Sequence, residues 1–260
     1  MPETKSARHS HGNPRITWFR VLCAVFGLGS AVGLFGIAVV IEWFVTGADK
    51  IHRLHNIGFG SITGIVVTTA FFVQLRNPER RIAPLQQVFA VAAAVVVASA
   101  LAQDFVELSL AAILAVAGGV VTALHPARVR FLRVSRGVSP VLGVLTVAAA
   151  VPLVGYALGQ ASLQRNGVAG DPHVDMHHYT GMAVMAVALV LCGAVASLRT
   201  GGYRVAAWTT GLAAIVFGIA SAVYRHAASS PARRWGAAAV IGGIVFILAA
   251  EWDRRRLVRE

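Results

Sequence analysis

Long apolar runs, separated by short clusters of charged residues, constrain the fold of this chain most strongly. Most runs have roughly 20 residues, the number that a helix needs to cross about 30 Å of hydrocarbon. Only helices and closed barrels satisfy all their backbone groups inside lipid, and these runs are too long for barrel strands. The sequence therefore predicts an all-α, polytopic membrane protein.

We expect about eight transmembrane helices, over residues 17–45, 57–75, 85–101, 105–124, 140–160, 178–198, 204–224 and 233–252. The polar segment 1–15 is expected to be a disordered cytoplasmic tail. An N-terminal four-helix half (16–137) and a C-terminal four-helix half (138–260) follow it. The first run is too long for the core of a signal peptide, so the first helix should be retained.

The distribution of positive charge predicts the orientation. If the N-terminus is cytoplasmic, the inner segments hold 17 of the 23 Lys and Arg residues. The positive-inside rule then puts both termini in the cytoplasm, in a bacterial inner membrane. The net charge of +12 follows from this topology. A nucleic-acid partner is not expected, because it would need a basic face on a soluble domain. The expected partners are the lipid bilayer and a membrane protein or a second copy of the chain.

Histidines gather on the predicted outer side of the membrane. Six of the nine lie there: His52, His55, His173, His177, His178 and His226. Three of the four methionines, Met176, Met182 and Met185, lie in or beside the segment that holds His173, His177 and His178. Histidine is the commonest metal ligand, and imidazole together with thioether suits copper. Pairs of His with His or Met also hold haem iron.

The sequence thus predicts a copper or haem site. The predicted cofactor-binding residues are His55, His178 and Met182, and the further predicted metal ligands are His52, His173, Asp175, His177, Met185 and His226. Structural histidines are also common at membrane interfaces, because the amphipathic ring suits the headgroup region. That alternative stays open at this point.

A weak internal repeat relates the two halves. A shift of 123 residues places Gly58 on Gly181, Arg76 on Arg199, and His55 on His178. A shift of four spans keeps the orientation, so the halves would be parallel repeats. Gly60 and Gly64 form a GxxxG pair, which is typical of close helix packing.

Two resemblances bear on function. The segment "HHYTGMAVM" (177–185) resembles the motif of MHYT-type membrane sensor domains, although His177 stands where that motif has Met. This resemblance implies copper binding by outer His and Met. The eight-span, two-half pattern, with "IHRLHNIG" (51–58) opening the second span, is similar to haem A synthase. That resemblance implies haem ligation by His55 and His178. The partner histidines of the fourth spans are absent: span four opens with Glu107, and span eight with Arg233 and Arg234.

The predicted function is binding of copper or haem at the outer face, in redox chemistry, sensing or metal handling. The alternatives are a transporter or channel for a small solute and a non-catalytic membrane subunit. A hydrolase built on Ser61, Asp104 and His226 lacks a recognisable motif. The sequence leaves open whether the protein is an enzyme.

Overall fold

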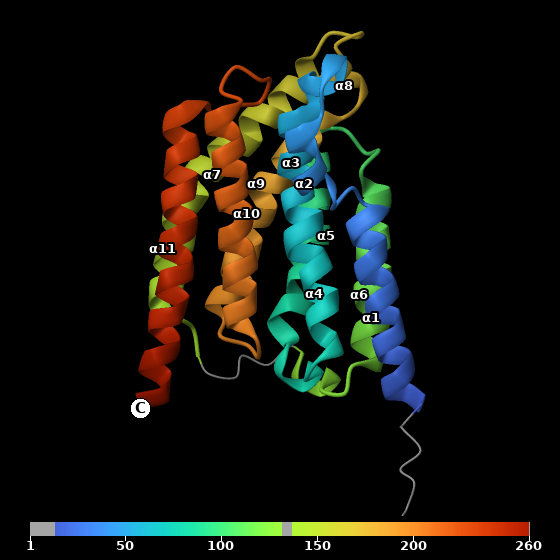
Figure 1. Cartoon of the computed structure of the whole chain (residues 1–260), viewed down its shortest axis with the longest axis vertical. Coiled ribbons are helices and arrows are strands. Elements are labelled where there is room, and N and C mark those ends of the chain that lie inside the picture. The colour runs from blue at the N-terminus through green and yellow to red at the C-terminus, as the bar shows by residue number, and fades with distance from the viewer. Residues whose placement is uncertain (1–13, 132–136, 260) are drawn as a thin grey trace, which may run out of the picture.

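The computed structural model describes residues 14–131 and 137–259, which form helices and loops and contain no strand. Seven helical segments are long and apolar enough to cross a membrane, and a shorter apolar helix, α6 (Leu108–Leu124), accompanies them. The helices run side by side along the long axis of the molecule (Figure 1). The prediction of a polytopic all-α fold is therefore confirmed. Residues 1–13 of the predicted tail lie outside the described residues.

Six of the long segments are single helices: α1 (Pro14–Val32), α5 (Ile82–Ala102), α7 (Pro140–Asn166), α9 (His178–Ser197), α10 (Tyr203–Val223) and α11 (Ala232–Arg259). The second span contains η2 (Gly47–His52), α3 (Arg53–Gly60), the π-helix η3 (Ser61–Val67), α4 (Thr68–Phe72) and η4 (Val73–Leu75). The short elements are α2 (Ala38–Ile41), η1 (Glu42–Phe44), η5 (Pro78–Arg80), η6 (Arg128–Arg130) and α8 (Pro172–Asp175). Helix α7 continues through Pro152.

The first span is broken, so the prediction of one continuous helix over 17–45 was wrong. Helix α1 ends at Val32, and Phe35 has a φ of 56°, in the left-handed region. The N–H of Gly36 then donates to the carbonyl of Ser30, six residues back, at 3.2 Å, so the i→i−4 pattern of the helix is lost here. Gly33 and Gly36 weaken the helix here, because glycine has a low helix propensity.

The second span begins earlier than predicted. It runs over Lys50–Leu75, whereas hydropathy predicted 57–75. The extra turns carry His52 and His55, whose polar side chains lower the local hydropathy although both residues are helical. His55 is buried, at 2% exposure. The earlier start builds these histidines into the helical bundle.

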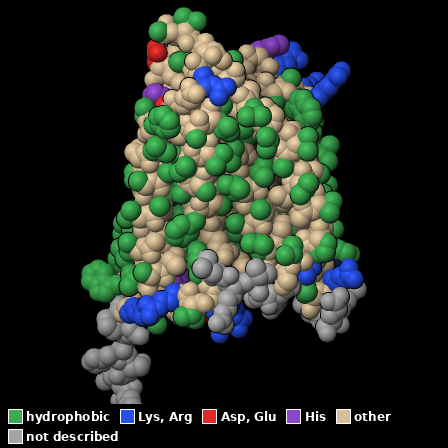
Figure 2. Space-filling model, turned by 180° about the vertical axis from the view of Figure 1, so that it is seen from behind, with side chains coloured by type: hydrophobic (Ala, Val, Ile, Leu, Met, Phe, Trp, Pro, Cys, Tyr) green, Lys and Arg blue, Asp and Glu red, His purple; other side chains and the backbone are tan. Residues whose placement is uncertain are grey.

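The two ends of the bundle differ in chemistry. The start of α1 and the end of α11 lie at one end, and α8 lies at the other (Figure 1). We call the end at α8 the histidine end, because it carries His52, His55, His173 and His178, and the opposite end the arginine end. Hydrophobic side chains cover the flank between the two ends, and Lys and Arg lie near the ends themselves (Figure 2). This surface fits a protein that spans a bilayer.

Helix α9 lies at the centre of the bundle, where it contacts α3, α5, α7 and α10. A buried polar network joins two of the neighbouring helices. The amide of Gln87 donates to Thr210 Oγ1 at 2.9 Å and to the carbonyl of Ala206 at 3.0 Å. The hydroxyl of Thr209 donates to Gln87 Oε1 at 3.1 Å. The network satisfies the buried amide of Gln87 and sets the register of α5 against α10.

Ion pairs attach α11 to its neighbours at the arginine end. The guanidinium of Arg199, which lies two residues after α9, pairs with the buried carboxylate of Asp253. Arg204 of α10 pairs with Glu251, which also accepts a hydrogen bond from Trp208 Nε1 at 2.7 Å. The buried pair depends on both partners, because either charge alone would be costly to bury.

His125 closes the loop after α6 as a buried neutral imidazole. Its Nδ1 accepts the N–H of Ala127 at 3.0 Å, so Nε2 carries the proton that it donates to the carbonyl of Pro78 at 3.1 Å. Burial lowers the pKa of His125. The unfolded chain therefore binds a second imidazole proton more readily than the folded chain does, and stability should fall as the pH drops through the unfolded pKa of about 6.5.

We expect His125→Ala to lower the free energy of unfolding by about 2–4 kcal/mol at neutral pH, because it leaves two buried backbone groups without partners. Thermal unfolding in detergent measures this change. The difference between wild type and variant should shrink from about pH 7.5 to about pH 5.5, since the variant lacks the titrating group. A difference that stays constant over this range would contradict the neutral buried imidazole.

Candidate functional site: a histidine cluster

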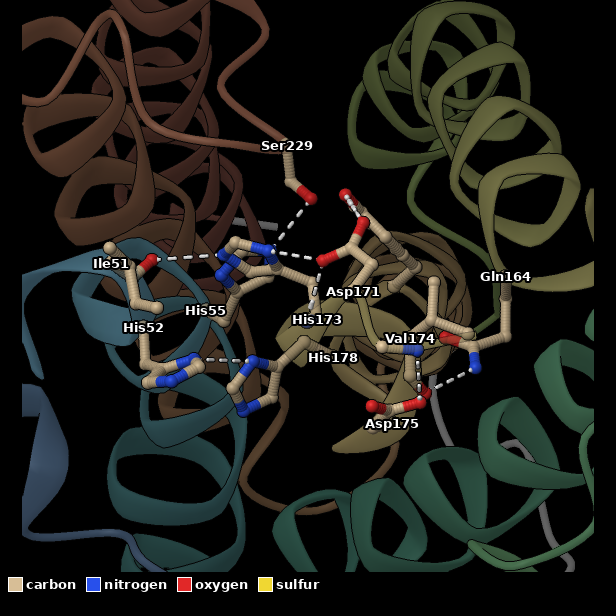
Figure 3. A network of polar contacts seen from close by, with 12 residues as sticks. Ile51, His52, His55, Gln164, Asp171, His173, Val174, Asp175, His178 and Ser229 are labelled. Carbon is tan, nitrogen blue, oxygen red and sulfur yellow. Dashed lines mark hydrogen bonds and ion pairs between the residues drawn. The ribbon is translucent and has the colours of Figure 1, made fainter. Parts of the chain in front are cut away.

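Four imidazole rings meet at the histidine end of the bundle. The ring of His178 lies 4.6 Å from that of His52 and 4.9 Å from that of His55, centroid to centroid. The rings of His55 and His178 are stacked, with an interplanar angle of 16°. The ring of His173 lies 4.8 Å from that of His55 (Figure 3). We call these four residues the histidine cluster.

Two segments far apart in the sequence supply the cluster. His52 ends η2 and His55 lies in the first turn of α3. His173 lies in α8 and His178 opens α9. The chain turns sharply between α8 and α9, because His177 has a φ of 57°. This turn sets the direction in which α9 leaves α8.

The N-terminus of α8 fixes the orientation of His173. Asp171 is the N-cap, and its Oδ1 accepts the backbone N–H of His173 at 2.9 Å and lies 3.0 Å from His173 Nδ1. These contacts lower the pKa of Asp171, the backbone hydrogen bond foremost. His173 Nε2 lies 3.2 Å from the carbonyl of Ile51. Both neighbours are acceptors, so both ring nitrogens of His173 are engaged and neither faces the other histidines as a free ligand.

The remaining three rings of the cluster have different partners. Nδ1 of His52 and Nδ1 of His178 lie 3.0 Å apart. Nε2 of His55 lies 2.8 Å from Ser229 Oγ, in the loop before α11. Nδ1 of His55 is buried and has no hydrogen-bond partner. A buried polar atom without a partner is uncommon in proteins and marks this nitrogen as a candidate ligand.

A cavity of about 450 Å³ lies beside the histidine cluster. Its lining combines titratable, apolar and thioether side chains: Phe35, Glu42, Val45, His52, His55, Asn56, Phe59, Glu107, Met176, His177, His178 and Gly181. Glu42 is buried at 8% exposure, and its Oε1 accepts a hydrogen bond from Asn56 Nδ2 at 2.8 Å. Its Oε2 is buried without a partner. Burial and the nearby Asp104 raise the pKa of Glu107.

His177 points away from the cluster into a separate network. Its Nδ1 lies 2.8 Å from Asp104 Oδ2, which also accepts the hydroxyl of Thr180 at 2.6 Å. A second cavity, of about 500 Å³, is lined by His177, Asp104, Asp175 and their neighbours. Asp175 Oδ1 lies 3.5 Å from the N–H of Gly170. Asp175 and His177 therefore belong to this second cavity, although His177 also lines the first.

The other predicted ligands lie elsewhere. His226 Nε2 accepts a hydrogen bond from Arg225 Nε at 2.9 Å, and His226 has no ring contact with the histidine cluster among those found in the described residues. Met182 and Met185 are fully buried in the core. The sulfur of Met182 packs against Gly58, where an added Cβ would lie only 2.9 Å from it. Of the predicted ligands, the structure therefore brings four imidazole rings into contact, those of His52, His55, His173 and His178.

The prediction missed the roles of Asn56 and Ser229. Asn56 fixes the buried carboxylate of Glu42, and Ser229 contacts the ring of His55. The sequence does mark Glu42 as a candidate, because a carboxylate close to an apolar run is costly unless it is paired or functional. Asn56 lies one residue after His55 and carries no comparable pattern.

Within residues 14–131 and 137–259, no three His, Cys, Asp or Glu side chains are arranged so that they could hold a metal ion together. The histidine cluster provides one close pair, His52 with His178, beside a third ring with a free nitrogen.

Comparison with protein-family models, with curated proteins and with solved structures gave no significant match. The fold and its apolar surface define the class as a polytopic integral membrane protein.

Proposed function

We propose that this protein binds a copper ion at its histidine end, for metal handling, sensing or redox chemistry. His52 and His178 are the first two ligands, and His55 becomes the third after a side-chain rotation that directs Nδ1 toward the pair. The observation that carries this proposal is the 3.0 Å separation of the two Nδ1 atoms beside a buried, unpartnered imidazole nitrogen.

The separation of the pair is compatible with chelation. Two imidazole nitrogens at about 2.0–2.1 Å from one ion lie about 2.9 Å apart at a right angle and about 3.3 Å apart at the tetrahedral angle. The observed 3.0 Å falls between these values. Without an ion, the same distance is an ordinary hydrogen bond between two neutral rings, so the pair can exist in both states.

The surroundings favour copper over haem. Met176 lines the cavity and is 55% exposed, so its thioether is accessible to an incoming ion. Imidazole and thioether together suit copper, above all Cu(I). The stacked rings of His55 and His178, 4.9 Å apart, are too close to hold a porphyrin between them as a bis-His pair.

Metal content and an absorption spectrum test the proposal. Purified protein loaded with copper and dialysed against a weak chelator should retain about one ion per chain and show no Soret band. Zinc and nickel loading serve as the comparison. Protein that retains no copper would refute the proposal, and a Soret band after addition of haem would replace copper with haem.

The charge distribution supports an orientation for this site. We propose that the chain lies in a bacterial inner membrane with both termini cytoplasmic, because most Lys and Arg residues belong to the segments at the arginine end. The histidine end then faces away from the cytoplasm. A fluorescent protein fused after Glu260 should fold and fluoresce, whereas alkaline phosphatase fused there should be inactive; the opposite pattern would reverse the orientation.

One observation favours a second function, the transport of a small solute. Discontinuous transmembrane helices are common in transporters, and the first span is interrupted between Val32 and Ala38, where it contacts the π-helix η3. Liposome flux of copper, with and without a pH gradient, tests this alternative. Flux that is saturable in wild type would make the histidine cluster a transport site; a lack of flux would leave it a binding site.

The apolar outer surfaces of α7 and α11 would also suit a third function, that of a non-catalytic subunit in a membrane complex. Large hydrophobic residues on both helices are exposed, among them Val144, Val151, Ile241 and Leu248. Lipid or a second membrane-spanning chain would cover such a surface. Light scattering of the purified protein in detergent distinguishes a monomer from an assembly.

A further inference from the structure

The cavity beside the histidine cluster has a lining of two kinds, polar and apolar. The polar part includes the carboxylate of Glu42, the amide of Asn56 and three histidines of the cluster, His52, His55 and His178. The apolar part includes Phe35, Val45, Phe59 and Gly181. A cavity of this kind fits a ligand with a polar head and an apolar remainder.

One oxygen of the Glu42 carboxylate lacks a hydrogen-bond donor. Asn56 satisfies Oε1, while Oε2 is buried and unpartnered. Among the described residues, no lysine or arginine lines this cavity, so neither residue type supplies a donor to Oε2. Leaving a buried acceptor unpaired costs free energy, and a ligand that donates a hydrogen bond to Oε2 would recover it.

The break in the first span gives the cavity a side that faces lipid. Phe35 lies in this break, lines the cavity and is 71% exposed. The backbone of Phe35 packs beside Gly60, which lies within the second span, so the exposed ring of Phe35 lies at hydrocarbon depth rather than in a polar loop. A molecule dissolved in the bilayer can therefore reach Glu42 past Phe35.

We propose that this cavity binds the hydroxylated aromatic head of a membrane-soluble amphiphile, of the quinol class. A ring hydroxyl donates to Glu42 Oε2, the flat ring packs against Phe35 and Phe59, and the tail leaves past Phe35 into the hydrocarbon. The carboxyl groups of Glu42 and Glu107 disfavour an anionic phosphate headgroup in the same position. Binding requires no metal ion, so this site is additional to the proposed copper site.

Binding of a quinol and its quinone to metal-free protein tests the proposal. The protein is treated with chelator, placed in lipid nanodiscs and titrated anaerobically with decyl-ubiquinol and with decyl-ubiquinone. The quinol should bind about tenfold or more tightly, because only the reduced ring donates hydrogen bonds to the carboxylate. Equal affinities, or no saturable binding of either form, would overturn the proposal.

Two variants separate the contributions of Glu42 and Phe35. Glu42→Gln keeps the shape but replaces the Oε2 acceptor with a donor, so quinol affinity should fall about tenfold while quinone affinity does not fall. Phe35→Ala should weaken both forms, because it removes one aromatic wall. Phe44→Ala is the matched control, since Phe44 is 79% exposed and does not line the cavity. If Glu42→Gln fails to fold, Phe35→Ala and the comparison on wild type decide the question.

Discussion

His178→Ala will lower the affinity of the purified protein for copper by at least about 100-fold. Residues that only support metal ligands typically cost 10–100-fold when mutated, and loss of a ligand should cost more. The ring of His178 contacts those of His52 and His55, and its Nδ1 is one of the two nitrogens of the 3.0 Å pair, so its removal takes away a ligand. Competition with a chromophoric copper chelator measures the affinity.

His226→Ala is the matched control for this experiment. His226 belongs to the same end of the chain's fold and contacts Arg225, without a ring contact to the cluster among the described residues. The copper affinity of the His226→Ala variant should equal that of the wild-type protein. Equal affinities for wild type and His178→Ala, with both proteins folded by circular dichroism, would remove the histidine cluster as the copper site.

Gly64→Ala will cause the largest loss of stability that we expect from adding a single methyl group. Gly64 lies in the π-helix η3 and packs against the break in the first span. A Cβ on Gly36 would lie 2.8 Å from the Cα of Gly64, and a Cβ on Gly64 would lie even closer to the carbonyl oxygen of Gly36. Backbone atoms cannot move aside as a side-chain end can, so the cost should reach about 3 kcal/mol or more.

Gly119→Ala is the control for Gly64→Ala. Gly119 lies within α6, and an added Cβ there would meet no atom within 4 Å. Alanine has the higher helix propensity, so this change should leave the melting temperature unchanged or raise it slightly. Thermal unfolding of both variants in the same detergent gives the comparison. Similar melting temperatures for the two variants would contradict the close crossing at Gly36.

Hydropathy predicted the fold class because lipid imposes a simple rule. Apolar runs long enough to span the hydrocarbon form helices, and α5, α9 and α10 end within three residues of the predicted limits. The break after Val32 escaped this rule, because Gly33 and Gly36 carry no polar side chain and do not interrupt the apolar run. What ends the helix there is backbone conformation and the packing of Gly36 on Gly64, and hydropathy reports neither.

The internal repeat predicted one part of the candidate site, because it places two histidines at corresponding positions of the two halves. The shift of 123 residues paired His55 with His178, and their rings are stacked in the structure. The spacing of His52 and His55 also indicated one helical face. The sequence pattern did not show that the side chains of His177 and His178 point in different directions. The direction of the His177 side chain depends on the left-handed φ of His177 itself and on Asp104, 73 positions away.

The contacts from distant loops were beyond sequence reasoning. Ser229 reaches the ring of His55 across 174 residues, and Asn56 fixes Glu42 in a short helical turn that hydropathy did not resolve. His226 was predicted as a ligand because it follows an apolar run near the same side. The loop after α10 instead directs it toward Arg225.

Pulsed electron paramagnetic resonance of the Cu(II)-loaded protein tests the copper site most directly, because it counts the imidazoles bound to the ion. We expect at least two coordinated imidazoles in wild type, and the loss of this signature in the double variant His52→Ala, His178→Ala. A wild-type spectrum without imidazole nitrogen, or one that the double variant leaves unchanged, would contradict a copper site formed by the 3.0 Å pair of Nδ1 atoms.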